Sequence, residues 1–257
     1  MIDRVTDEVT EKLPSRLTAL DRLETTNGSF VRALNNNTLA QLTWVGRSHH
    51  NDLHYILERQ GESLQSLEFR CEEVDCPSFA PDFDIWILPN MTQNLTHLSV
   101  NVPRNGTWPL ESLQVIASLP HLKSADVWMN IQSPRVQQKE ESAIAYTIGW
   151  ERDKCKGENQ FQRPFVDKAG AEQLFRYMKD NNEGGELSNV TFHVGDWQRP
   201  WDGPLYFPPW VEGRRAKVVC TSEAKGQDEG WCVVETGVKY WEDQHARYGG
   251  DYDEWDD

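Results

Sequence analysis

The segment Leu64-Gln-Ser-Leu67-Glu-Phe69 has leucine at its first and fourth positions and an apolar residue at its sixth position. The same pattern recurs in Leu39-Ala-Gln-Leu42-Thr-Trp44 and in Leu95-Thr-His-Leu98-Ser-Val100. Weaker copies are Leu122-Lys-Ser-Ala125-Asp-Val127 and Leu187-Ser-Asn-Val190-Thr-Phe192. Alternation of apolar and polar residues over such short stretches is typical of strands, so the sequence predicts five similar strands.

The sequence between these copies is typical of helices. The apolar residues at helical spacing are Leu53, Ile56 and Leu57, then Leu110, Leu113, Ile116 and Ala117, then Ala171, Leu174, Phe175 and Met178. Ser48 and Pro109 suit the start of the first two helices, and Gly61 and Pro120 suit their ends. Strand and helix therefore alternate along the chain.

The spacing of the copies predicts the architecture. Their starts are 25, 31, 27 and 65 residues apart, and the first three gaps fit or slightly exceed the ~20 to 29 residues of a leucine-rich repeat. Neighbouring strands joined by a returning helix must run parallel, so we expect an α/β solenoid of the leucine-rich-repeat type with an irregular β-rich C-terminal cap. An ordinary α/β domain whose strands happen to look alike is the alternative.

The pattern also predicts a contact face. The first, fourth and sixth residues of each copy point into the core, so the third, fifth and seventh point outward on the concave side. Gln41, Val45, Ser66, Ser124 and Asn189 share this face with the predicted contact residues. Those contact residues are Thr43, Glu68, Arg70, His97, Ser99, Asn101, Asp126, Trp128, Thr191 and His193.

The chain divides into four expected regions. Residues 1–35 would form an N-terminal cap or a first degenerate repeat, and residues 36–195 the repeat arc, with an insertion near 132–164. Residues 196–248 would form an aromatic cap with a hairpin, and residues 249–257 an acidic, disordered tail. In the hairpin, centred on Gly226, we expect Cys220 to face Cys232, Val219 to face Val233, and Lys217 to face Glu235.

Composition excludes some classes of function. The chain has 257 residues, with 26 Lys and Arg against 41 Asp and Glu, a net charge of −15. Such a surface repels nucleic acid and anionic lipid. No apolar run is long enough to cross a bilayer, and the first thirty residues lack the apolar core of a signal peptide. We therefore expect an intracellular protein, cytoplasmic or nuclear.

Six N-glycosylation sequons argue against an intracellular location. They begin at Asn27, Asn36, Asn90, Asn94, Asn105 and Asn189. A secreted chain would carry glycans there, whereas an intracellular chain would use the same residues for turns and strand edges. In a reducing compartment Cys220 and Cys232 would be free thiols, and Cys71 and Cys76 structural thiols.

The stretches from Val31 to Trp44 and from Ile56 to Phe69 resemble the divergent leucine-rich repeats of fungal F-box-like proteins. The resemblance covers residues 31–130 and, more loosely, 165–240. It implies a repeat arc that binds other proteins, and an N-terminal F-box module that joins a Skp1-type adaptor of a ubiquitin ligase. Leu13-Pro14 begins as such a module does, but the helical stretch after it, up to Leu23, is shorter than an F-box.

Catalytic and metal-binding patterns are weak. The sequence has no Gly-x-Ser-x-Gly, no phosphate-binding loop, no His-Glu-x-x-His and no Cys-x-x-Cys. His50, His54 and Glu58 recur every fourth residue and share a helix face, a spacing more typical of a solvated surface than of a metal site. We expect no catalytic residue, cofactor or metal ion.

These patterns favour a non-catalytic protein-binding module, with a ubiquitin-ligase substrate receptor as one form of that role. Trp128 would be the anchor of the contact face, and the acidic balance predicts a basic partner protein. The alternative is a glycan-active enzyme or a carbohydrate-binding protein. It would use the aromatic segment from Trp197 to Trp210 and the carboxylates of Asp196 and Asp202, a segment that otherwise suits a cap on the open end of the sheet.

Overall fold

The structure is a computed structural model, and the residues it describes are 20–47, 52–71, 85–131, 162–195, 216–222 and 231–236. The strands are β1 (Arg22–Glu24), β2 (Gln41–Val45), β3 (Ser66–Arg70), β4 (His97–Asn101), β5 (Ser124–Met129), β6 (Asn189–Val194), β7 (Ala216–Thr221) and β8 (Cys232–Thr236). The helices are α2 (Gly28–Ala33), α3 (Asp52–Gln60), the 3-10 helix η1 (Ile85–Ile87), α4 (Leu88–Met91), α5 (Leu110–Ala117) and α8 (Lys168–Asp180).

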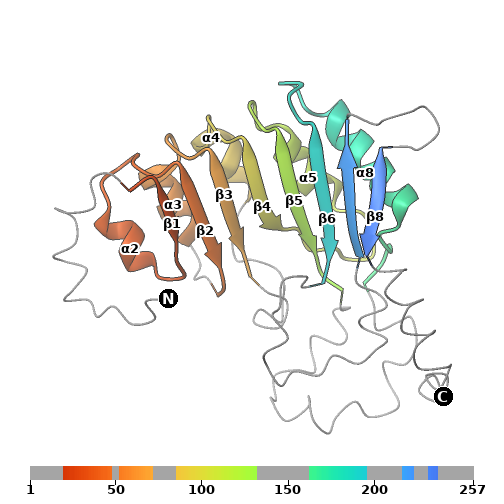
Figure 1. The fold of residues 1–257 in the computed structure, drawn as a ribbon, viewed down its shortest axis with the longest axis horizontal. Helices are drawn as coiled ribbons and strands as arrows, with labels where there is room; N and C mark the ends of the chain where they lie inside the picture. The colour runs from red at the N-terminus through yellow and green to blue at the C-terminus, as the bar shows by residue number, and fades with distance from the viewer. Residues whose placement is uncertain are drawn as a thin grey trace, which may run out of the picture.

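The strands form one open sheet in which spatial order follows chain order, from β1 at one edge to β8 at the other (Figure 1). Strands β1 to β6 pair in parallel, and β7 and β8 are added antiparallel. The prediction of an α/β fold with a parallel sheet is therefore confirmed. Because each parallel strand pairs with the next one in the sequence, every strand–helix unit adds to the end of the last.

One face of the sheet supplies the core. Two rows of inward side chains cross the strands in register: Leu42, Leu67, Leu98, Ala125, Val190 and Cys220, then Trp44, Phe69, Val100, Val127, Phe192 and Val218. All twelve are buried. The ten residues of β2 to β6 are the fourth and sixth positions of the sequence pattern, so the predicted inward direction of those positions is confirmed; Cys220 and Val218 of β7 extend the two rows. Two inward apolar side chains from each strand thus build a continuous apolar layer.

The helices cover this apolar layer from behind the sheet in the view of Figure 1. Helix α3 contacts α4, α4 contacts α5, and α5 contacts α8, so the helices also form a continuous layer. The predicted stripe Ala171, Leu174, Phe175 and Met178 of α8 is buried, and the Asp167 carboxylate caps that helix by accepting a hydrogen bond from the Gly170 N–H at 2.7 Å. Leu110 departs from its predicted stripe. It begins α5 and is 40% exposed.

Buried amides join successive units at their corners. The Gln60 Oε1 accepts hydrogen bonds from the Thr38 and Leu39 N–H groups at 2.9 and 3.1 Å, and its Nε2 donates to the Asn35 carbonyl at 2.7 Å. Asn182 makes a similar link between the last residue of α5 and the turn after α8, because its Nδ2 donates a hydrogen bond to the Ala117 carbonyl. These side chains satisfy turn groups that the ladder of the sheet leaves unpaired.

The first strand–helix unit, β1 and α2, lies within residues 1–35, which the sequence predicted to form an N-terminal cap or a first degenerate repeat. Leu23, the last leucine of the F-box-like stretch, lies in β1, and both Leu20 and Leu23 contact the common core. The short helices η1 and α4 were not predicted. Most of 132–164, the aromatic segment 197–210 and the acidic tail lie outside the described residues.

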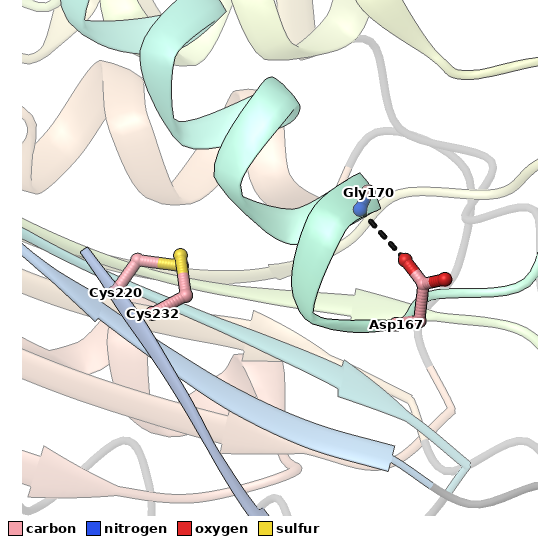
Figure 2. The surroundings of a disulfide bond; sticks show 4 residues. All are labelled: Asp167, Gly170, Cys220 and Cys232. Carbon is pink, nitrogen blue, oxygen red and sulfur yellow. Dashed lines mark hydrogen bonds between the residues drawn. A yellow bond between two sulfur atoms is a disulfide. The ribbon is translucent and has the colours of Figure 1, made fainter. Parts of the chain in front are cut away.

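The C-terminal hairpin is present, with one change of register. Cys220 faces Cys232 and Val219 faces Val233, as predicted. Lys217, however, faces Thr236, and the predicted pairing with Glu235 is wrong, because the register shifts between Lys217 and Val218. The prediction of free thiols is also wrong. Cys220 and Cys232 form a disulfide on the helix side of the sheet, beneath α8 (Figure 2).

Candidate functional site

The face of the sheet opposite the helices carries three rows of side chains. The first row is Gln41, Ser66, His97, Ser124 and Asn189. The second is Thr43, Glu68, Ser99, Asp126 and Thr191, and it continues into Val219 and Val233. The third includes Val45 paired with Arg70, and Asn101, Trp128, His193 and Lys217 in line. All ten predicted contact residues therefore project from this outward face.

The rows differ in accessibility. Thr43, Glu68, His97, Asp126 and Thr191 are half-buried and keep surface open to solvent. The other five predicted contact residues are buried: Arg70, Ser99, Asn101, Trp128 and His193. The accessible part of the outward face is thus made mainly by the first two rows, apart from the buried Ser99. In the third row Arg70, Asn101, Trp128 and His193 are buried, and Val45 and Lys217 at its two ends are half-buried.

A stack of three side chains accounts for this burial. The Arg70 guanidinium lies 4.1 Å from the centroid of the Trp128 ring. The His193 ring stacks on Trp128 with a centroid distance of 3.9 Å and an angle of 4° between the planes. Stacking on aromatic faces removes both sides of an indole from water, so Trp128 is 4% exposed and offers a partner almost no surface. The predicted anchor is instead part of the sheet's own packing.

Hydrogen bonds fix the edges of the stack. The Arg70 Nε donates to Glu68 Oε1 at 2.7 Å, and the Trp128 Nε1 donates to Ser99 Oγ at 3.0 Å. Asn101 is used elsewhere: its Oδ1 accepts from the Cys71 N–H at 2.6 Å, and its Nδ2 donates to the Cys71 carbonyl at 3.1 Å. Ser99 and Asn101 therefore use their polar groups within the chain.

Asp126 lies between two imidazoles. Its Oδ2 is 3.6 Å from His97 Nε2, and its Oδ1 is 3.9 Å from His193 Nε2. Burial by itself raises the pKa of Asp126, but the neighbouring imidazoles of His193 and His97, together with Thr191, outweigh it and lower the pKa below the ordinary carboxyl value. The carboxylate therefore stays ionised on the half-buried part of the face.

Ser124, His97 and Asp126 form a contact chain that superficially matches a hydrolase triad. The Ser124 Oγ is 2.8 Å from His97 Nδ1, within hydrogen-bond distance. The 3.6 Å between His97 and Asp126 is longer than a hydrogen bond, so the carboxylate does not orient the imidazole as nucleophilic catalysis requires. The arrangement suits a polar surface network better than an activated serine.

The outward face ends in an apolar area that the contact prediction did not include. Val219 and Val233 extend the second row beyond Thr191, and Val233 is 63% exposed. The sequence already indicated this apolar area, because the predicted hairpin register paired Val219 with Val233. Extending the row pattern across the antiparallel strands would have found them.

The remaining candidates contribute little. His54 Nε2 and Glu58 Oε1 are 3.0 Å apart on α3, whereas His50 lies outside the described residues, as do Asp196 and Asp202. Among the residues that the structure describes, no group of three or more His, Cys, Asp or Glu side chains is placed to hold a metal ion. Within the same ranges, none of the helices has the length and apolar character needed to cross a bilayer.

Comparison with known proteins adds no relationship. No family model, no curated protein and no solved structure matches this chain.

Proposed function

We propose that the chain is a leucine-rich-repeat-like arc and a non-catalytic protein-binding module, and that its partner lies across the first two rows of the outward face. The observation that carries the proposal is the register of these rows. Side chains from five successive parallel strands, β2 to β6, stand in line at the third and fifth positions of each copy. A surface built by repetition suits an extended partner, because each unit adds contacts beside those of the last.

The charges on the face suggest the chemistry of the partner. Glu68 and Asp126 present half-buried carboxylates; that of Glu68 is paired with the Arg70 guanidinium, which is buried against Trp128. The net charge of −15 would also attract a positively charged protein over a longer range. A segment with Lys or Arg side chains fits the carboxylates, and an apolar side chain fits Val219 and Val233 at the far end of the second row.

The test compares two double variants that remove the same charge. Glu68→Gln with Asp126→Asn neutralises the outward face, whereas Glu111→Gln with Asp180→Asn neutralises exposed positions on α5 and α8. Each immobilised protein would capture partners from a eukaryotic lysate, with quantitative mass spectrometry as the readout and thermal melting to confirm folding. We expect proteins that bind the wild type and the helix variant to be at least tenfold depleted on the face variant.

Two results would oppose this proposal. Equal recovery of every partner by both variants would remove the outward face from binding. If partner proteins were depleted only on the helix variant, the binding surface would lie on the helical layer. Recovery of a Skp1-type adaptor by all three proteins would place the chain in a ubiquitin ligase through residues other than these carboxylates.

A further inference from the structure

The oxidation state of the cysteines differs from that of an intracellular protein. All three cysteines in the described ranges are disulfide-bonded: Cys220 with Cys232, and Cys71. Cys220 and Cys232 are fully buried, on the inward row that faces α8 (Figure 2). Stable buried disulfides are typical of proteins that fold in oxidising compartments and are rare in the cytosol and nucleus.

The asparagines show a second, independent pattern. Every one of the six sequon asparagines is exposed: Asn27, Asn36, Asn90, Asn94, Asn105 and Asn189. The three buried asparagines of the described ranges are Asn101, Asn130 and Asn182, and none of them begins a sequon. An N-linked glycan must project into water from its asparagine, so this distribution is what a glycosylated fold requires.

The sequons also lie where glycans would fit around the sheet. Asn36 and Asn94 precede β2 and β4, whereas Asn27 and Asn105 follow β1 and β4, so these four lie beyond opposite ends of the strands. Asn90 is in α4, on the helix side. None of these five lies in the second row of the outward face, and only Asn189, at the start of β6, belongs to the first row.

From these two patterns we propose that the chain matures in an oxidising, glycosylating compartment and carries N-linked glycans on its exposed sequon asparagines. The asparagine Nδ2 would displace the diphosphate of a lipid-linked sugar. A bond forms from Nδ2 to the anomeric carbon, the carbon–oxygen bond to the diphosphate breaks, and Nδ2 loses one proton. For the disulfide, two thiols lose two protons and pass two electrons to the disulfide of a thiol-exchange oxidoreductase.

This inference stands independently of the proposed binding function. The second row contains no sequon asparagine, so a glycosylated chain could still bind a partner there, whereas a glycan on Asn189 would cover the first row at β6. A glycosylated chain would, however, be separated from cytosolic adaptors of ubiquitin ligases. The partner would then be an extracellular or luminal protein.

The test uses the full chain isolated from its native source. Treatment with peptide N-glycosidase in ¹⁸O-labelled water converts each glycosylated asparagine into labelled aspartate, which peptide mass spectrometry locates. We expect labelled aspartate at one or more of the six sequons and none at Asn35 or Asn37, which are exposed but begin no sequon. The peptides containing Cys220 and Cys232 should remain linked until a reductant is added.

The glycan result decides the proposal. If all six sequon asparagines are unmodified in the native protein, the proposal is wrong, whatever the state of the cysteines. Label at Asn35 or Asn37 in amounts equal to the sequons would indicate spontaneous deamidation and would also overturn it. Neither result depends on Glu68 or Asp126, so failure here is distinct from failure of the binding proposal.

Discussion

The rings of Trp128 and His193 stack almost parallel, 3.9 Å apart, although the two residues are 65 positions apart in the sequence and belong to different strands, β5 and β6. They meet because β5 and β6 pair in register, which places Trp128 directly opposite His193. The stack turns two outward side chains into a buried unit that also supports Asp126. The outward face therefore consists of a polar surface above an internal aromatic layer.

Trp128→Ala is expected to lower the free energy of unfolding by about 3 to 5 kcal/mol, because it leaves a cavity between Arg70 and His193. Trp128→Phe should cost less than half as much, since it keeps an aromatic ring and loses the hydrogen bond to Ser99. Urea unfolding followed by circular dichroism measures both values. Val233→Ala, at an exposed position of the same face, should stay within about 0.5 kcal/mol of the wild type. A similarly small effect of Trp128→Ala would show that the stack contributes no stability.

The lowered pKa of Asp126 predicts that the free energy of unfolding depends on pH in the acid range. Its pKa in the folded chain is lowered, so its charged form stabilises the fold above the ordinary carboxyl pKa, and that contribution disappears as the pH falls through the folded value. The difference in unfolding free energy between the wild type and Asp126→Asn should therefore be largest near about pH 5 and shrink toward about pH 2. Asp180→Asn, at the exposed end of α8, is the control. A difference that is constant over this range would mean that the imidazoles do not stabilise the carboxylate.

The fold was predictable from sequence where one residue type repeats at one position. Leucine at the first position, with an apolar residue at the fourth and the sixth, identified five strands, and the burial of these residues follows from the pattern alone. The first unit was not among the five copies because Leu20-Asp-Arg-Leu23-Glu-Thr25 has leucine at the first and fourth positions but a polar threonine at the sixth. The shift at Lys217 was missed because a bulge depends on local backbone geometry that neighbouring residue types do not specify.

The candidate site was predictable in direction but not in accessibility. Successive side chains of a strand point to opposite faces of the sheet, so the position in the pattern decides the face. All ten predicted contact residues project from the outward face. Whether such a side chain reaches water depends on its neighbours across strands, such as Arg70 and His193 on either side of Trp128. Those contacts depend on pairings between residues tens of positions apart, which the pattern within one strand does not contain.

Gln60 is expected to be more important for stability than its polar side chain suggests. Gln60→Ala leaves the N–H groups of Thr38 and Leu39 without their acceptor in a buried turn, which should cost about 2 to 4 kcal/mol. Gln65→Ala, at an exposed position just before β3, should change stability by less than about 0.5 kcal/mol. Thermal and urea unfolding of the two variants provide the comparison, and equal stabilities would contradict the role given to the Gln60 amide.

Gly184 marks a place where the backbones of successive units touch. A Cβ at this position would lie 2.0 Å from the Pro120 carbonyl oxygen, and Gly61 shows the same relationship to Met91 at 2.2 Å. Since the obstacle is backbone, Gly184→Ala must separate two corners of the sheet, and we expect a loss of about 1 to 3 kcal/mol. Gly28→Ala is the matched control, because a Cβ there meets its nearest atoms at 3.8 Å. Urea unfolding should show a loss for Gly184→Ala and none for Gly28→Ala, whereas equal stability of the two variants would mean that the corners can move apart without cost.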